Sequence, residues 1–227
     1  MWRFVQSLLF QAQCPLCRRP AQSQFCRDCT AQILQERSPN PIQQWQGAFP
    51  RWVWGRYEGQ LRRAITAMKF EQRPEIGLWL GEQLAEQWLA QSALSKSLAN
   101  CQVVPIPLHR AKQQQRGYNQ SEKIAAGFCR WTGYPLYPQA LQRIKNTQAL
   151  FSLSPGDRQR ELQSVFQVGK QFNRKYPWLI VDDIVTTGST AQEAKQAIEQ
   201  QGGRVIGLVA IAAPSRNPSR QYSDLLK

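Results

Sequence analysis

Acidic side chains, histidine and long apolar runs are all scarce in this chain of 227 residues. Asp and Glu together number 15 against 29 Lys and Arg, there is one His, and the formal net charge is +14. Such an excess of positive charge attracts polyanions, whether nucleotides, phosphorylated sugars or nucleic acid. No apolar run approaches the roughly 20 residues of a transmembrane helix, so we expect no insertion into a membrane.

Several sequence motifs are absent as well. The chain has no G-x-x-x-x-G-K-[ST] and no G-x-G-x-x-G, which argues against a triphosphate cradle and against a dinucleotide site. It has no G-x-S-x-G, so no serine lies in a recognisable nucleophile turn. The opening stretch "MWRFVQSLLFQAQC" has a single basic residue and no small-residue cleavage site, and we therefore expect a cytoplasmic protein.

Four of the six cysteines form two C-x-x-C pairs, "CPLC" and "CRDC", eight residues apart. Their sulfurs belong to Cys14, Cys17, Cys26 and Cys29. Two such pairs suit a tetrahedral thiolate site, for which Zn²⁺ is the usual metal. A closed site of this kind is structural and folds a segment too small to bury its own core. Structural disulfides and a rubredoxin-type iron centre are the alternatives. We expect the remaining Cys101 and Cys129 to be buried thiols.

The hydrophobic pattern divides the chain into a small N-terminal module and one main domain. Residues 1–45 should hold an N-terminal helix and the four-cysteine module, and the Pro- and Gln-rich stretch 37–50 links it to the domain over 46–227. Leu61, Ile65 and Met68 recur with helical spacing, and a second helix is expected over Ile76 to Ala90.

The second half of the chain alternates between strand and helix patterns. Strands are expected in "CQVVPIPL" (101–108), "WLIVDD" (178–183) and "RVIGLVAIAA" (204–213), with helices over 119–131 and 189–201 and short strands near 134–138 and 164–169. Alternation of this kind predicts an α/β fold with a parallel sheet flanked by helices.

Two adjacent acids, Asp182 and Asp183, end the strand at 178–183, and ligands collect at the carboxyl ends of parallel strands. The loop that follows offers hydroxyl groups, a glycine and the backbone N–H groups of the next helix, which together suit a monophosphate. Its residues are Thr186, Thr187, Gly188, Ser189 and Thr190. Carboxylates accept hydrogen bonds from vicinal hydroxyls, so the combination indicates a phosphorylated ribose. The alternative is a helix cap, with Thr187 or Ser189 as the N-cap residue.

The stretch "VDDIVTTGST" resembles the phosphoribosyl-pyrophosphate (PRPP) motif of type I phosphoribosyltransferases. More narrowly, the chain resembles the ComF family, the competence-associated phosphoribosyltransferase-like proteins of bacterial DNA uptake. The supporting segments are "CPLC…CRDC", "AITAMKF", "VVPIPLHRAKQQQRGYNQ" and "RIKNTQALFSLSPGDRQRELQSVF", so the resemblance extends over essentially the whole chain.

This resemblance implies a type I phosphoribosyltransferase-like fold, with hood elements at about 50–95 and a core at about 100–215. It implies that Asp182 and Asp183 are catalytic and bind the ribose hydroxyls with Mg²⁺, while residues 186–190 hold the 5′-phosphate. Pyrophosphate would bind at the loop 105–109, with Pro107, and at Arg116 and Lys69. One departure is that the family usually shows an Arg-x-x-Asn pair where this chain has Arg158 followed at that spacing by Glu161.

Two classes of function remain open at this point. The first is an enzyme that transfers a phosphoribosyl group to an unidentified nitrogen acceptor as pyrophosphate leaves. The second is a binding protein that senses PRPP or a nucleotide and holds single-stranded DNA or a competence protein, for which Arg116, Tyr118 and the tryptophans supply phosphate contact and stacking. The lone His109 is either a general base or a surface or packing residue.

Overall fold

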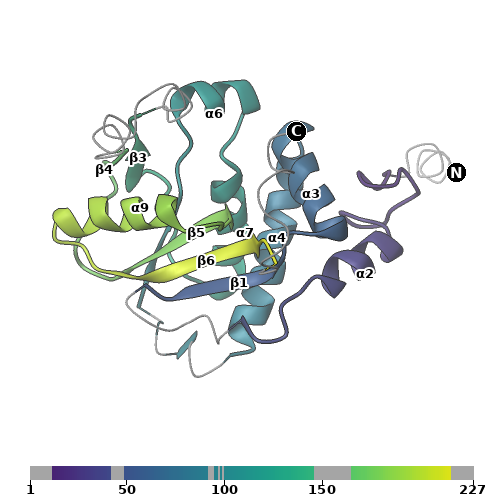
Figure 1. The fold of residues 1–227 in the computed structure, drawn as a ribbon, viewed down its shortest axis with the longest axis horizontal. Helices are drawn as coiled ribbons and strands as arrows, with labels where there is room; N and C mark the ends of the chain where they lie inside the picture. The colour runs from purple at the N-terminus through teal and green to yellow at the C-terminus, as the bar shows by residue number, and fades with distance from the viewer. Residues whose placement is uncertain are drawn as a thin grey trace, which may run out of the picture.

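Four parallel strands form one sheet in the order β1–β6–β5–β2 (Figure 1). The computed structural model describes residues 12–41, 49–91, 95–96, 98, 100–145 and 165–215. The strands are β1 (Arg51–Arg56), β2 (Gln102–Pro105), β5 (Trp178–Ile184) and β6 (Val205–Ala213). Val103 on β2 faces Leu179 on β5, and Asp182 on β5 faces Ala210 on β6. The expected parallel sheet flanked by helices is confirmed.

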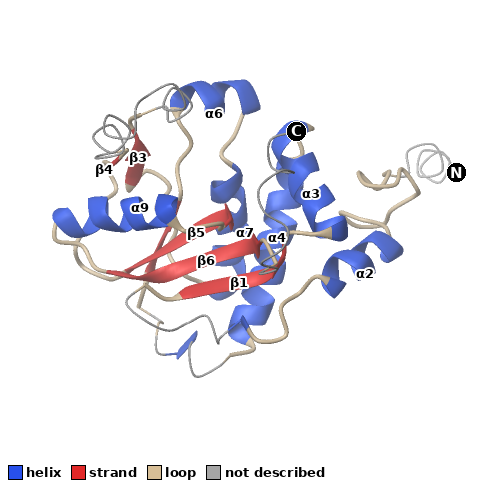
Figure 2. Cartoon of the chain, viewed as in Figure 1, coloured by secondary structure: helices blue, strands red, loops and turns tan. Residues whose placement is uncertain are grey.

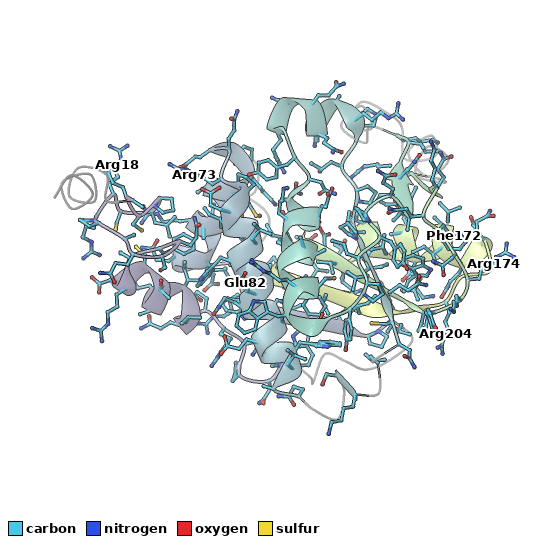
Figure 3. All side chains as sticks on the ribbon, turned by 180° about the vertical axis from the view of Figure 1, so that it is seen from behind. Arg18, Arg73, Glu82, Phe172, Arg174 and Arg204 are labelled. Atoms are coloured by element: carbon cyan, nitrogen blue, oxygen red, sulfur yellow. The ribbon has the colours of Figure 1, made fainter. Side chains whose placement is uncertain are left out.

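Alternate residues of each strand pack on opposite faces of the sheet, because successive side chains of a strand point in opposite directions. Leu179 and Val181 face one hydrophobic cluster, and Ile180 faces the other. The first cluster is formed with α3 (Gly59–Phe70), α4 (Pro74–Leu89) and α7 (Gln120–Thr132). The second is formed with α9 (Ser189–Gln200). Figure 2 shows α9 on the near side of the strands, and Figure 3 shows α4 and α7 covering the far side.

Helices α4 and α7 cross at very close range because glycine lies at both contact points. A Cβ atom on Gly81 of α4 would lie 2.0 Å from the carbonyl oxygen of Ile124, and one on Gly127 of α7 would lie 2.1 Å from that of Leu78. Beside this crossing, Trp88 is fully buried and packs edge-on against Phe128. The crossing fixes the start of α7 over the carboxyl end of the sheet.

Most elements agree with the sequence-based expectations, and the differences have local causes. The expected strand at 134–138 forms only an isolated bridge between Leu136 and Val103, because Pro135 and Pro138 have no N–H to donate to a ladder. A short helix that we did not expect, α6 (Arg110–Arg116), follows β2. Strand β4 (Phe166–Val168) forms where a short strand was expected near 164–169. It pairs antiparallel with β3 (Leu141–Arg143), a strand that we did not expect.

The cysteine module extends into α2 (Arg27–Gln35), which has Cys26 as its N-cap and contains Cys29, and it packs in the first hydrophobic cluster. The Phe25 ring meets the Trp79 ring edge-on with centroids 5.1 Å apart, and Arg63 of α3 donates to the Leu16 carbonyl at 2.7 Å. The expected N-terminal helix, the boundary between residues 45 and 46, and both Arg158 and Glu161 lie outside the described residues. Among the helices that are described, none has the length and apolar character needed to cross a bilayer.

Candidate functional site at the carboxyl end of the sheet

Asp182 is buried at the end of β5 and is held by neutral donors. Its Oδ1 atom accepts hydrogen bonds from the Ser121 hydroxyl at 3.0 Å and from the Asp183 N–H at 2.8 Å. Burial, and secondarily the charge of Asp183, raises the pKa of Asp182 to about 7. Its proton is therefore exchangeable near neutral pH, as is common for carboxyl groups that do chemistry in a cleft. Ser121, at the start of α7, is a contributor that sequence reasoning missed.

Asp183 forms an ion pair with Lys69 across the site. The Lys69 Nζ atom lies 2.6 Å from Asp183 Oδ2, with the two side chains only 19% and 7% exposed. Asp183 Oδ1 also accepts from the Ile184 N–H at 2.8 Å. The structure therefore places Lys69, which we expected at pyrophosphate, on one of the two acids. It brings together two candidate residues from opposite halves of the chain.

The loop after β5 leads into the N-terminus of α9. Gly188 is the N-cap residue, with φ of 82°, and its helix has no side-chain cap and no acidic residue in its first turn. Thr187 accepts from the Ser189 N–H at 3.3 Å, so this hydroxyl occupies one amide of the turn. The helix-cap alternative, which assigned the N-cap to Thr187 or Ser189, is therefore wrong about the residue. A helix N-terminus arranged in this way favours an anion.

Arg51, at the start of β1, reaches the same loop, and sequence reasoning did not single it out. A Cβ atom on Gly188 would lie 2.6 Å from one guanidinium nitrogen of Arg51 and 2.7 Å from its Cζ. Glycine at 188 therefore serves two needs, the positive φ and the room for this guanidinium. No local sequence signal connects Arg51 with the loop, because the two meet only through the sheet order.

The loop expected to bind pyrophosphate follows β2 and borders a cavity of about 560 Å³. Pro107, His109, Asn119, Glu122 and Arg143 are among its lining residues. His109 is the N-cap of α6 and accepts from the Ala111 N–H at 3.4 Å. This contact gives the histidine a structural role, in line with the packing alternative.

Basic side chains gather around α6. Arg116, at its end, lies with its Cζ atom 5.7 Å from the centroid of the Phe70 ring. The pKa of Lys112 is lowered, mainly by burial and then by the charges of Arg143, Arg116 and Lys69. Lys112 is a further cation that the sequence did not single out. A gathering of like charges favours the binding of a multiply charged anion.

The four thiols of the N-terminal module converge on one point. The sulfur atoms of Cys14, Cys17, Cys26 and Cys29 all lie within 4.8 Å of one another. All six cysteines are free thiols, so the disulfide alternative is not realised, and Cys101 and Cys129 are buried as expected. A hydrogen bond from Arg19 is the main cause that lowers the pKa of Cys17 to about 6. The spacing of the four thiols is compatible with a structural zinc ion.

Comparison with known proteins bears on the whole chain. No protein-family model matches it. "Competence protein F" of Haemophilus influenzae is 25% identical over 209 residues, covering 88% of this chain and 89% of that protein. "DNA utilization protein YhgH" of Salmonella typhimurium is 27% identical, covering 85% and 93%, and "Competence protein ComFC" of Bacillus subtilis is 24% identical, covering 83% and 72%. Together with the cysteine module and the acidic pair at the end of β5, these relatives support the resemblance of the chain to the ComF family.

Proposed function

We propose that this protein binds PRPP with Mg²⁺ at the carboxyl end of its sheet and acts in the handling of incoming DNA. The observation that carries the proposal is the buried pair Asp182 and Asp183, next to the open N-terminus of α9. Acids that can accept from a sugar diol, beside a turn that favours phosphate, match a phosphorylated ribose. The role in competence and DNA use rests on the names of the relatives.

Each part of PRPP would find a complementary group. The two carboxylates would accept from the ribose 2′- and 3′-hydroxyls, and the N–H groups of residues 186–190 would donate to the 5′-phosphate. The loop containing Pro107 and the basic residues near Arg116 would meet the pyrophosphate. Carboxylate and phosphate oxygens are the ligands that Mg²⁺ prefers, and the ion would neutralise pyrophosphate charge.

Transfer would break the bond between C1 of the ribose and the pyrophosphate oxygen as a nitrogen nucleophile bonds to C1. Positive charge develops on the sugar in this step, and the carboxylates of Asp182 and Asp183 would stabilise it. Lys69 contacts Asp183 Oδ2 at 2.6 Å and so would help to fix the position of this carboxyl group. The N–H groups of the α9 first turn would keep the sugar positioned while pyrophosphate leaves.

The second candidate function is a non-catalytic accessory protein that senses PRPP or a nucleotide and binds single-stranded DNA or a competence protein. The net charge of +14 favours it, since phosphate contact supplies most of the affinity of sequence-independent DNA binding. The chain's single histidine, His109, is engaged as the N-cap of α6, which agrees with a structural role for this residue.

Calorimetric titration with PRPP, with and without Mg²⁺, tests the site. We expect Mg²⁺-dependent binding by the wild-type protein, loss of binding in the double variant Asp182→Asn/Asp183→Asn, and no loss in Glu199→Gln, which removes an exposed carboxylate of α9. Absence of binding by the folded wild-type protein would overturn the proposal. If PRPP binds, release of pyrophosphate on addition of nucleobases or oligonucleotides would distinguish a phosphoribosyltransferase from a non-catalytic PRPP sensor.

For the cysteine module we propose a structural zinc ion. All four sulfurs are available as ligands, and three of the cysteines are buried against hydrophobic residues of the main domain. A Cys₄ site leaves no open coordination position, so the ion would hold the module in shape and take no part in transfer. Metal analysis of freshly purified protein should find about one zinc per chain.

A further inference from the structure

Phe70, at the carboxyl end of α3, presents its ring to solvent at the rim of the proposed site. Its side chain is 73% exposed, more than any other large hydrophobic side chain in the described part of the chain. The preceding residue, Lys69, reaches Asp183 at 2.6 Å, so Phe70 directly follows the residue that pairs with the acidic site. The three residues that follow Phe70 are exposed as well, and one of them, Arg73, is labelled in Figure 3.

An arginine lies against this ring, and a second pair of the same kind occurs at the other end of α3. The Arg116 Cζ atom is 5.7 Å from the Phe70 centroid, and the Arg62 Cζ atom is 5.9 Å from the Tyr57 centroid. Residues 62 and 69 are seven apart, so Arg62 and Lys69 share one face of the helix. Within the described ranges, neither arginine has a carboxylate within ion-pair distance. Both guanidinium groups therefore keep donors that can meet phosphate.

Arginines stacked on aromatic rings, of which Phe70 is exposed and Tyr57 is half-buried, are the features that bind single-stranded nucleic acid. Arginines contact the backbone phosphates, and each aromatic ring offers its open face to a base. The bases of a duplex are already stacked on one another and cannot use such a face. A free small anion would make no use of the exposed face of the Phe70 ring.

We propose that this surface, which we call the α3 ridge, binds a single DNA strand, with one base stacked on the open face of Phe70. The ridge consists of Tyr57, Arg62, Thr66, Lys69, Phe70 and Arg116. The inference rests on the proposed function, because a strand on the ridge would pass directly beside the phosphoribosyl site. It adds to that function the surface on which the DNA lies.

Two acidic residues just after α3 should weaken the binding of DNA to the ridge. Glu75 lies 3.6 Å from Arg73, which offsets part of its charge. Glu71 follows Phe70 directly and is exposed, and among the described residues it makes no ion pair. Replacement of Glu71 by Gln should therefore tighten DNA binding, most clearly at low salt.

Fluorescence anisotropy with a labelled thymidine 12-mer tests the ridge. Phe70→Ala should weaken binding about tenfold, and Phe70→Trp should restore it, because each stacked base contributes through its ring face. The matched control is Trp131→Ala, which removes a ring that is 57% exposed near the far end of α7. Arg116→Gln should weaken binding and reduce the salt slope by about one.

The outcomes separate this inference from the proposed function. The ridge is not the DNA surface if the wild-type protein does not bind the 12-mer or binds a duplex of equal length as tightly. The same conclusion follows if Trp131→Ala weakens DNA binding as much as Phe70→Ala does. PRPP titration is compared on the wild-type protein alone, because Arg116, which packs against Phe70, is itself assigned to the pyrophosphate. If Phe70→Ala loses DNA affinity and the wild-type protein does not bind PRPP, the proposed function is overturned, whereas the α3 ridge is still supported as the DNA surface.

Discussion

Removal of one carboxylate from the acidic pair should make the protein more stable, and by an amount that depends on pH. In the folded protein, burial and the charge of Asp183 raise the pKa of Asp182 from 3.8 to about 7. Below about pH 4 Asp182 is protonated whether the chain is folded or unfolded, so its ionisation adds nothing to stability there. Between these two pKa values the unfolded chain ionises while the folded protein keeps the proton, and stability falls as pH rises.

The size of the effect follows from the gap between the two pKa values. Each pH unit in the gap corresponds to about 1.4 kcal/mol, so ionisation of Asp182 lowers the free energy of unfolding by about 4 kcal/mol once the pH exceeds 7. Asp182→Asn removes this penalty. The amide oxygen of Asn can still accept from the Ser121 hydroxyl and from the backbone N–H of residue 183. The variant should thus gain stability while losing the ability to bind PRPP, a familiar trade between stability and function.

The assay is urea unfolding of both proteins between pH 5.5 and 8.5, followed by tryptophan fluorescence. Buried reporters are available in Trp52, Trp88 and Trp178. The quantity of interest is the difference between variant and wild type at one pH, in which any zinc-linked effect cancels. This difference should grow with pH up to about 7 and then stay level. A difference that is constant across the range, or that grows towards low pH, would refute the assigned cause of the pKa shift.

Three further predictions concern close contacts and the metal. Gly81→Ala should destabilise the protein by about 3 kcal/mol in urea unfolding, because its Cβ would lie 2.0 Å from the Ile124 carbonyl oxygen; a loss below about 1 kcal/mol would show that α4 can shift. Gly188→Ala should lower the free energy of unfolding by about 1–2 kcal/mol because residue 188 has a positive φ. The added Cβ should also displace the Arg51 guanidinium, so the affinity for PRPP should fall. Unchanged PRPP affinity in calorimetry would contradict this. In Cys26→Ser, metal analysis should find well below one zinc per chain, and the melting temperature should fall. Full zinc content would argue against Cys26 as a ligand.

The local signals in the sequence were sufficient for the elements that depend on neighbouring residues. Alternating and helical hydrophobic spacing predicted α7, β5, α9 and β6 nearly to their ends, whereas β2 ends at Pro105, three residues before the expected end. The short helix α6 was not predicted, because "RAKQQQR" has no apolar face and none of its residues is buried. Strand β3 was missed because three residues are too few to show a period.

By itself, the sequence determined the two parts of the molecule whose chemistry lies within a single stretch of chain. The spacing of "CPLC" and "CRDC" predicted one thiolate cluster, and the order of acids and hydroxyls in "VDDIVTTGST" predicted a site at the end of a strand. Only the tertiary structure decided which distant residues complete that site. Ser121, Lys69 and Arg51 reach it from α7, α3 and β1, three elements that the sheet order and helix packing bring to one edge. The raised pKa of Asp182 likewise depends on burial, which arises when these elements pack together and cannot be read from any one of them.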